Sequence, residues 1–442
     1  RFDISKIDFD ILKREFTKIN KKNLMLKDLD DLQIKKVDEK GNAISGAVFN
    51  VKYSDGTNIG NYTTNSSGGI TISNLKQGNV KVKEVSVSDK YVLDTTEKSV
   101  KLEYNSTSTL NVTNNIKKGY IEVTKKDAKT GKVVQKAGTE FEILSNNKVI
   151  STIKTSSNGI AKSGLLEYGS YVVREKTQPQ NFTLTTATAT VNVYENNKTY
   201  KINISNQPVT GQIILTKSDK ETGNKAQGDA TLAGATYVLK ANENILDPSD
   251  GIILFKKDET ISKKTIGSGT WGDVGTKTVD GNYQITWSNL PMGSFRIEET
   301  ISPTGYLLDS NHIVNLSSTS SNKSLEVKTV ESKEQVKKGY IEVTKKDAKT
   351  GKVVQKEGTE FEILYNNKVI STITTSSNGV AKSGLLPYAR YTVREKKSPN
   401  GYTSTTEIKT VDVHENNKTY KVNISNQPVT GQIILTKSDK ET

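Results

Sequence analysis

Apolar and polar residues alternate in short runs along most of this chain. The runs are rich in Val, Ile, Thr and Tyr, and they are separated by turns that contain Gly, Asn, Asp or Ser, such as Asn158-Gly159 and Asn378-Gly379. Alternation with a period of two is typical of strands that bury one face, and regularly spaced turns are typical of a small β-sandwich. The pattern therefore predicts an all-β protein made of several small β-sandwiches.

Residues 1–27 follow a different pattern. Apolar side chains recur there at spacings of three and four residues, and two residues that favour helix N-caps precede them. The apolar positions are Phe9, Leu12, Phe16 and Ile19, and the N-cap candidates are Ser5 and Asp8. This predicts an amphipathic helix of about three turns, either a packing helix that remains from a preceding region or a helix that binds a partner.

Internal repetition sets the domain organisation. Residues 117–222 match residues 337–442 at an offset of 220, and the stretch YIEVTKKDAKTGKVVQK occurs identically in both. More divergent copies share short motifs in the same order, such as KVDEKG, SGAVF and VKVKE in the first copy. We predict four domains and the start of a fifth: residues 28–116, 117–207, 208–335 with an insertion at about 240–286, 336–427, and 428–442 as the first strand of a further repeat.

The first strand of every predicted domain ends with a lysine on its apolar side. Because side chains two residues apart share a face of a strand, a lysine that continues the apolar alternation points into the core. A second strand places a glutamate in the same register, and the last strand of three domains places an asparagine there. The lysines are Lys36, Lys125, Lys217 and Lys345, the glutamates are Glu84, Glu175, Glu299 and Glu395, and the asparagines are Asn114, Asn206 and Asn426. Counting back along the last strand of the third domain places Glu331 at the asparagine position.

A lysine and a glutamate inside so small a core must be paired, displaced to its edge or chemically consumed. Removing an ion from water costs several kcal/mol even after relaxation, whereas a domain of this size has only about 5–15 kcal/mol of net stability. Burial lowers the pKa of a lysine and raises that of a carboxylate, so such a pair can exchange a proton and leave a neutral, nucleophilic amine. Attack of the amine on a neighbouring asparagine amide, with an acid to protonate the departing ammonia, yields a Lys–Asn isopeptide bond. The alternative is a buried Lys–Glu ion pair with an asparagine that hydrogen-bonds the strand ends.

Composition excludes several other kinds of site. The 442 residues include no Cys and only two His, so thiol catalysis, disulfides and Cys- or His-rich metal sites are excluded, and we expect no metal and no cofactor. The net charge of +14 comes from lysines spread through every segment rather than gathered in a stripe, which favours a solvated surface and no nucleic-acid partner. No run of about 18 apolar residues occurs, so we expect no membrane insertion of this segment.

The motifs KKD, AGTEF, SSNG, SPNGY and VNISN, in this order, resemble the collagen-adhesin B-type (CnaB-like) domain, also called the SpaA-type or prealbumin-like domain, of Gram-positive surface proteins and pilins. The resemblance covers about residues 28–427 and implies Ig-like, prealbumin-like β-sandwiches. It also implies that the lysine of the first strand is joined to the asparagine of the last strand, with the glutamate as a proton relay. The implied cross-links are Lys36 to Asn114, Lys125 to Asn206 and Lys345 to Asn426, with Glu84, Glu175 and Glu395 as relays. In the third domain we expect Lys217 to form a salt bridge with Glu299 or Glu331 instead of a cross-link.

These features favour a structural function, in which the only reaction is one autocatalytic turnover per cross-link. The resemblance implies the stalk of a cell-surface adhesin, attached to the cell wall of a Gram-positive cell. Two alternatives stay open: a subunit of a covalently assembled pilus or fibre whose partners are neighbouring copies, and a module that binds a host matrix protein or glycan through the insertion of the third domain. Trp271, in the Gly-rich stretch GSGTWGDVG, is the candidate ligand contact. The chain begins without Met and ends inside a repeat, so we expect an internal piece of a longer protein.

Overall fold

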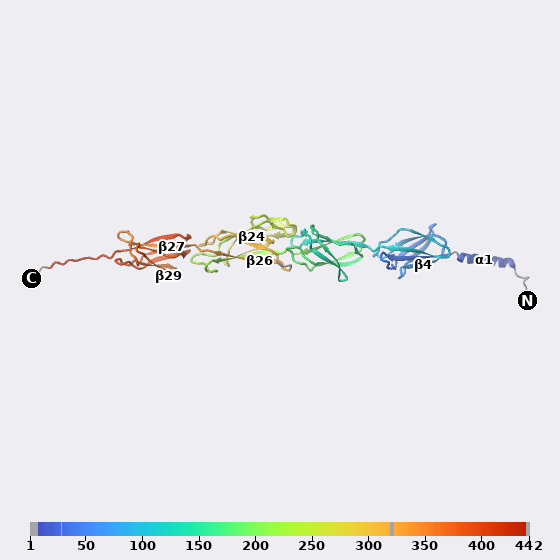
Figure 1. The fold of residues 1–442 in the computed structure, drawn as a ribbon, viewed down its shortest axis with the longest axis horizontal. Coiled ribbons are helices and arrows are strands. Elements are labelled where there is room, and N and C mark those ends of the chain that lie inside the picture. Colours follow the sequence, from blue (N-terminus) through green and yellow to red (C-terminus); the bar gives the residue numbers. More distant parts are fainter. Residues whose placement is uncertain (1–7, 28, 319–321, 439–442) are drawn as a thin grey trace. The chain divides into compact units, whose positions relative to one another are not determined.

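The computed structural model describes residues 8–27, 29–318 and 322–438. Its helix α1 (Phe9–Lys27) is labelled in Figure 1. Asp8 caps this helix, because its Oδ1 accepts hydrogen bonds from the backbone N–H groups of Asp10 at 3.0 Å and Ile11 at 3.2 Å. A carboxylate at this position bonds N–H groups that have no partner within the helix. The other N-cap candidate, Ser5, lies outside the described residues. The apolar side of the helix is exposed at Phe9, Leu12, Phe16 and Ile19.

We number the domains 1 to 4 and keep the boundaries given above. Domain 1 consists of two sheets, with strand orders β4-β1-β7 and β3-β2-β5-β6. In the first sheet β1 pairs antiparallel with β4 and parallel with β7, so the first and last strands of the domain are neighbours, and Asp38 lies opposite Asn114. The strands are β1 (Leu29–Asp38), β2 (Val48–Tyr53), β3 (Asn58–Thr63), β4 (Gly69–Lys76), β5 (Gly78–Ser86), β6 (Lys98–Leu102) and β7 (Thr107–Asn114).

Domain 2 repeats this arrangement with one strand split in two. Its sheets are β10-β9-β13-β14 and β11-β8-β12, and the last strand β15 also pairs with β8. The strands are β8 (Lys118–Asp127), β9 (Glu140–Ser145), β10 (Lys148–Lys154), β11 (Ile160–Lys162), β12 (Leu166–Glu167), β13 (Gly169–Glu175), β14 (Thr188–Val193) and β15 (Thr199–Asn206).

Domain 4 has the same two sheets as domain 2, as its nearly identical sequence requires. They are β29-β28-β32-β33 and β30-β27-β31, and β34 pairs parallel with β27, with Asp347 opposite Asn426. The strands are β27 (Lys338–Asp347), β28 (Glu360–Tyr365), β29 (Lys368–Thr374), β30 (Val380–Lys382), β31 (Leu386–Pro387), β32 (Ala389–Lys397), β33 (Ile408–Val413) and β34 (Thr419–Asn426).

Domain 3 carries two extra hairpins on the same plan. Its sheets are β23-β16-β26 and β22-β17-β24-β25, and the pairs β18-β19 and β20-β21 form the additional two-stranded sheets. The strands are β16 (Thr210–Asp219), β17 (Thr236–Ala241), β18 (Ile245–Leu246), β19 (Ile253–Phe255), β20 (Lys264–Ile266), β21 (Gly269–Trp271), β22 (Thr276–Thr278), β23 (Gln284–Leu290), β24 (Gly293–Ile301), β25 (His312–Leu316) and β26 (Leu325–Glu334).

Each domain has its own apolar core, to which both of its sheets contribute. In domain 1, for example, Ile34 of β1 packs in one cluster with Phe49 and Val51 of β2. Comparable clusters fill domains 2, 3 and 4. Strands that bury one face against a facing sheet show the alternation seen in the sequence. The predicted fold class, a series of small all-β domains after a short helix, is confirmed.

Contacts between Cα atoms divide the chain into two compact units. One contains residues 1–125, 135–177 and 185–204, and the other contains residues 126–134, 178–184 and 205–442. The division passes through domain 2, because its segments 126–134 and 178–184 belong to the same unit as domain 3.

Residues 429–438 form no strand, contrary to our prediction of a first strand there. The side chains of Ile433 and Leu435 are 96% and 92% exposed, whereas the identical sequence in domain 3 forms β16 and buries Ile213 and Leu215 completely. The physical reason is the absence of partner strands. β16 is held between β23 and β26, and the described part of the chain contains no counterparts of these two strands for residues 429–438.

Candidate cross-linking sites

In domain 4 a lysine, a glutamate and an asparagine meet inside the core. Lys345 lies on the buried side of β27, Glu395 lies on β32, and Asn426 ends β34. The Lys345 Nζ is 2.7 Å from Glu395 Oε1 and donates a hydrogen bond to Asn426 Oδ1. Asn426 Nδ2 donates to both carboxylate oxygens of Glu395, at 2.9 and 2.8 Å. Each of the three side chains therefore contacts the other two.

Domain 1 contains the same set of contacts. Lys36 Nζ donates to Asn114 Oδ1 and lies 3.3 Å from Glu84 Oε1. Asn114 Nδ2 donates to the two oxygens of Glu84 at 3.0 and 2.8 Å. All three side chains are at most 1% exposed. The strand alternation places the lysine there, because Lys36 continues the buried face of Leu32 and Ile34.

Domain 2 buries the corresponding residues. Lys125 Nζ lies 2.7 Å from Glu175 Oε1, and neither side chain is accessible to solvent. Asn206 ends β15, the strand that pairs with the lysine strand β8, and it is 1% exposed. The three residues thus occupy the strands that hold their counterparts in domains 1 and 4.

Domain 3 differs at the position on the last strand. In the parallel pairing of β16 with β26, Glu334 lies opposite Asp219, as Asn426 lies opposite Asp347 in domain 4. Placing Glu331 at the asparagine position was therefore wrong by three residues. Glu331 is half-exposed and bonds Lys333 and Ser218, whereas Glu334 is buried.

The lysine of domain 3 lies among two carboxylates and a hydroxyl. Lys217 Nζ is 2.7 Å from Glu299 Oε1, contacts Glu334 Oε1 and donates to the Tyr237 hydroxyl at 2.6 Å. The hydroxyl of Tyr237 also donates to Glu334 at 3.2 Å and is 2.7 Å from Ser332 Oγ. The expected salt bridge with Glu299 is present, and the second carboxylate is Glu334 rather than Glu331.

A backbone N–H group, which we did not predict from the sequence, holds the glutamate in place. In each domain the Oε2 atom of this glutamate accepts the backbone N–H of the residue ten positions later. A fixed acceptor bond leaves the other oxygen aimed at the lysine. The constant separation of ten residues is the signal that could have found it. The pairs are Glu84 with Asp94 at 3.1 Å, Glu175 with Thr185 at 3.1 Å, Glu299 with Asp309 at 2.6 Å, and Glu395 with Thr405 at 3.1 Å.

An aromatic ring lies beside each buried lysine. The ring faces attract a cation, which partly offsets the loss of water around the ammonium group. The ring is the last residue of four similar stretches, SGAVF, AGTEF, AGATY and EGTEF, one in each domain, so the sequence carried a signal for it. The distances from Nζ to the ring centroid are 5.9 Å for Lys36 and Phe49, 5.7 Å for Lys125 and Phe141, 5.0 Å for Lys217 and Tyr237, and 5.7 Å for Lys345 and Phe361.

Burial changes the protonation of these lysines. Desolvation lowers the pKa of all four below the ordinary lysine value, and the neighbouring glutamate opposes that change without cancelling it. A lowered pKa makes the neutral amine, which is the nucleophilic form, more accessible at neutral pH.

The contacts in domains 1 and 4 suit a reaction in which the lysine nitrogen replaces the side-chain amide nitrogen of the asparagine. A neutral Lys345 Nζ can add to Asn426 Cγ, and Glu395, which touches both nitrogens, can carry the proton that the lysine loses to Asn426 Nδ2. One bond forms between Nζ and Cγ, the bond between Cγ and Nδ2 breaks, and ammonia leaves. Fixed proximity of the reacting groups supplies much of the rate advantage of such a step.

The profile of the SpaA family, described as a prealbumin-like fold domain, matches residues 30–116, 119–208, 211–331 and 339–428. The chain belongs to the SpaA family. Its four SpaA domains follow one another in tandem, and each contains one of the buried lysine sites described above. No curated protein matches the chain.

Several solved structures are similar to this chain. The TIE protein of Bacillus anthracis superposes with a TM-score of 0.56 at 22% sequence identity, over 87% of this chain and 69% of that one. BcpA, the major pilin subunit of Bacillus cereus, is 17% identical over 69% of this chain and 99% of its own, with a TM-score of 0.32. The shaft pilin SpaA from Lactobacillus rhamnosus GG is 14% identical over 50% of this chain and 98% of its own, with a TM-score of 0.21.

Trp271 is not a solvent-exposed contact in the third SpaA domain. Its side chain is fully buried in the apolar core, and Lys129 of domain 2 lies over its ring at 4.2 Å from the centroid. The prediction was wrong because the neighbouring glycines permit close packing rather than a loose loop. A Cβ on Gly272 would lie 2.1 Å from the carbonyl oxygen of Ser262.

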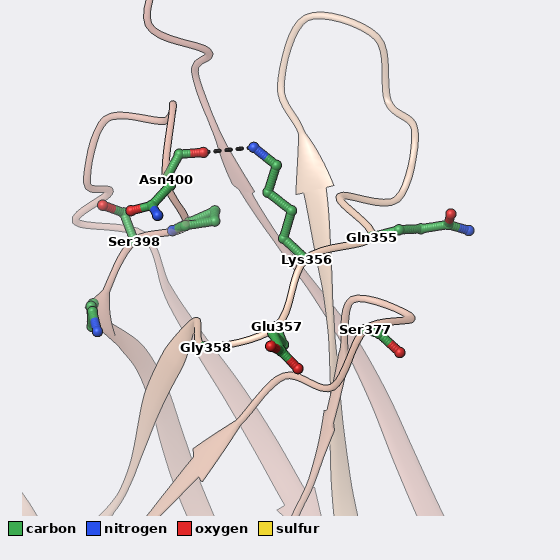
Figure 2. Close-up of a pocket in the computed structure, with 9 residues that line it drawn as sticks. Gln355, Lys356, Glu357, Gly358, Ser377, Ser398 and Asn400 are labelled. Atoms are coloured by element: carbon green, nitrogen blue, oxygen red, sulfur yellow. Dashed lines mark hydrogen bonds between the residues drawn. The ribbon is translucent and has the colours of Figure 1, made fainter.

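A hollow on domain 4 is separate from the buried triad. Figure 2 shows it with the Lys356 side chain extended across to the backbone carbonyl of Asn400, to which Nζ donates at 2.8 Å. None of Lys345, Glu395 and Asn426 lines it. Among the described residues no group of three or more His, Cys, Asp or Glu is arranged to hold a metal ion, and no helix has the length and apolar character needed to cross a membrane.

Proposed function

We propose that this chain is part of the stalk of a cell-surface adhesin of a Gram-positive cell, and that domains 1, 2 and 4 are each closed by an intramolecular Lys–Asn isopeptide bond. The observation that carries the proposal is the closed set of contacts among Lys345, Glu395 and Asn426, which recurs in domain 1. An ion pair alone would not need an amide in contact with both charged groups.

The position of the proposed bond suits a protein under tension. In domain 1 the lysine strand β1 and the asparagine strand β7 run parallel as neighbours. A pulling force that enters at the start of β1 passes along it to Lys36, crosses the bond to Asn114 and leaves at the end of β7. Strands β2 to β6 lie between these two residues in the sequence and stay outside the loaded path. A stalk built in this way cannot be lengthened by unfolding those strands.

The bond also stabilises the folded domain. Lys36 and Asn114 are 78 residues apart, and closing a loop of this size restricts the unfolded chain by about 4–5 kcal/mol, by analogy with a disulfide. Disulfides supply this constraint in many extracellular proteins, and this sequence has no Cys.

Domain 3 keeps its lysine as an ion pair in this proposal. Lys217 lies between Glu299 and Glu334, and a carboxylate hydroxyl leaves less readily than ammonia. The burial of Trp271 gives no support to a ligand site centred on that side chain, so the stalk is preferred to a ligand-binding module.

The intact mass of the denatured chain tests the cross-links. We expect a mass below the sequence mass by three molecules of ammonia, one each for domains 1, 2 and 4. A mass equal to the sequence mass would overturn the proposal. The loss of an additional molecule of water would reveal an amide between Lys217 and Glu334 and would overturn the ion pair in domain 3.

Stretching single chains tests the mechanical function. When one chain is pulled from its ends, we expect a single domain-sized lengthening, from domain 3, because the other three domains have no free length to release. Domain-sized lengthening from domains 1, 2 and 4 would contradict the load path. Covalent ladders of chains isolated from the producing cell would favour the fibre subunit over the stalk.

A further inference from the structure

A turn of domain 2 is covered by domain 3. The turn consists of residues 127–133, and we call it the domain 2 turn. Lys132 Nζ is 2.9 Å from Asp247 Oδ2 and also pairs with Asp250. Lys129 donates to Asn289 and lies over the ring of Trp271. Opposite charges and a cation over an aromatic face thus join the two domains.

Backbone packing shows how closely the two surfaces fit. The hairpin of β20 and β21 lies against the domain 2 turn, and Ser268 donates its N–H to the Thr130 carbonyl oxygen at 3.0 Å. A Cβ on Gly269 would lie 2.5 Å from the Lys129 carbonyl oxygen, and one on Gly267 would lie 2.1 Å from that of Thr130. Only glycine allows this approach.

Domain 4 carries an identical turn that is exposed. Residues 347–353, the domain 4 turn, repeat residues 127–133 letter for letter. Both turns form the same internal hydrogen bonds, such as Gly131 N–H to Asp127 O and Gly351 N–H to Asp347 O, each at 2.8 Å. Thr130 is buried, yet its counterpart Thr350 is exposed, as are Lys349 and Lys352. The difference comes from coverage by domain 3 and not from the turn itself.

The sequence after domain 4 repeats the sequence after domain 2. Residues 428–442 are identical to residues 208–222, which begin domain 3 and include β16. Residues 429–438 expose the apolar side chains that β16 buries. A segment of this kind forms a stable strand in water only when neighbouring strands pair with it and cover its apolar side chains.

We propose that the domain 4 turn is a docking surface for a further domain of the domain 3 type, which would continue from residue 428. Its aspartates would pair with Lys352 as Asp247 and Asp250 pair with Lys132. Its tryptophan would lie under Lys349, and its glycine hairpin would cover Thr350. The joint between domains 2 and 3 would then recur after domain 4.

One contact of the joint differs between the two turns. Asp127 accepts a hydrogen bond from Ser249 Oγ of domain 3 at 2.7 Å. Asp347 instead accepts from the hydroxyl of Tyr402 in its own domain at 2.9 Å, because Tyr402 stands where domain 2 has Phe182. A carboxylate has about four acceptor sites, so Asp347 can accept a serine as well. The two lysines and the backbone carbonyl groups are the same in both turns and would carry the docking.

Hydrogen exchange of the two turns in the 442-residue chain tests the existing joint. Because their sequences are identical, their intrinsic exchange rates are equal, and peptides that include Ala137 or Glu357 distinguish them. We expect the domain 2 turn to exchange roughly tenfold more slowly or better. Gly269→Ala should remove this difference, since its Cβ would press on the Lys129 carbonyl. Gly281→Ala, with no atom near its added Cβ, should preserve it.

Extension of the chain tests the docking surface. Adding a second copy of residues 223–335 after Thr442 completes a fifth domain. We expect exchange of the domain 4 turn to slow to the rate of the domain 2 turn, and a Gly269→Ala change in the added copy to restore fast exchange. If the added domain folds, as judged by slow exchange in its own core strands, and the domain 4 turn still exchanges fast, the proposal is wrong. An equal slowing in the Gly269→Ala version would also overturn it.

Discussion

Domains 3 and 4 hold the same lysine and the same glutamate in the same register, and they differ in what faces those residues. In domain 4 the last strand contributes Asn426 and the neighbouring ring is Phe361. In domain 3 the last strand contributes Glu334 and the ring is Tyr237, whose hydroxyl contacts the lysine.

The difference separates two ways of tolerating a buried lysine. Domain 4 places an amide against the lysine, and an amide carbon is an acceptor whose leaving group, ammonia, departs once it is protonated. Domain 3 surrounds the lysine with acceptors of hydrogen bonds, which stabilise the charged form. In the proposed function, one residue on the last strand thus decides between a cross-linking reaction and an ion pair.

The largest expected effect comes from Glu395→Gln in domain 4. Glutamine keeps the size of the side chain but carries no proton between the lysine and the amide, so we expect no cross-link in domain 4. The intact mass of the variant should then lie two molecules of ammonia, instead of three, below its sequence mass. Domain 4 should lose about 4–5 kcal/mol, together with a further cost for an unpaired buried lysine. Intact mass and hydrogen exchange in β27 and β34 measure both.

The control for that change is Glu360→Gln. Glu360 pairs with Lys396 at the surface, at 3.0 Å. We expect the cross-link to form normally and the stability of domain 4 to change little, because exposed ion pairs contribute little to stability. Normal cross-linking in Glu395→Gln would remove the glutamate from the proposed chemistry.

Converting domain 3 into domain 4 should create a bond. Glu334→Asn places an amide opposite Asp219, the register that Asn426 has opposite Asp347. We expect the loss of one more ammonia and a gain of up to about 4–5 kcal/mol in the stability of domain 3. Glu331→Asn, three residues away on the exposed side, should change neither. A bond formed by Glu331→Asn instead would overturn the register argument.

A smaller effect is expected from Tyr237→Phe. The change keeps the ring beside Lys217 but removes a hydroxyl that contacts Lys217 at 2.6 Å and Ser332 at 2.7 Å. Leaving such groups with fewer partners in a buried site costs about 1–3 kcal/mol. Denaturant unfolding of domain 3, with hydrogen exchange as the probe, measures this loss of stability. The control is Tyr283→Phe in the same domain, which should cost clearly less. An equal loss in both variants would show that the hydroxyl of Tyr237 has no special function.

The smallest effect is a pH dependence confined to domain 3. Desolvation lowers the pKa of Lys217 below the ordinary 10.5, so the folded state binds fewer protons than the unfolded state between the two values. Stability therefore rises with pH in that window, by at most about 1.4 kcal/mol per pH unit. Burial raises the pKa of Tyr237 above the ordinary 10.0, which reverses the trend above pH 10. A rise in the stability of domain 3 as pH approaches 10, absent from cross-linked domain 4, is the expected result.

Alternation was enough to predict the buried lysines. Lys36, Lys125, Lys217 and Lys345 follow strictly alternating apolar positions, and each is fully buried. The last strand of domain 3 was harder, because its sequence offers no Asn-Lys-Thr-Tyr anchor from which to count. The pair Glu334-Gln335 before the linker matches Asn206-Gln207 and Asn426-Gln427, and this would have given the correct register.

Contacts between domains could not be predicted from the sequence, for a reason different from the one that affected the last strand of domain 3. A Gly-rich stretch such as the one around Trp271 is typical of an exposed loop, yet Gly267 and Gly269 lie against the carbonyl oxygens of Thr130 and Lys129. A glycine required for close packing and a glycine in a loose turn look the same in a single sequence. The first strand at residues 429–438 failed in turn because a strand depends on neighbours, whatever its own pattern.

The distance along the chain between the two residues of the proposed bond would also determine when that bond can form. Lys345 and Asn426 are 81 residues apart and meet only when β34 pairs with β27. Until the last strand of a domain has paired with the first, its polypeptide is linear, without a cross-link, and can pass unfolded through a narrow export pore. Once that strand is in place, the proposed reaction would release ammonia and make the closure permanent. Folding of a domain and formation of its isopeptide bond would thus be separate events in time, and the bond would make folding irreversible.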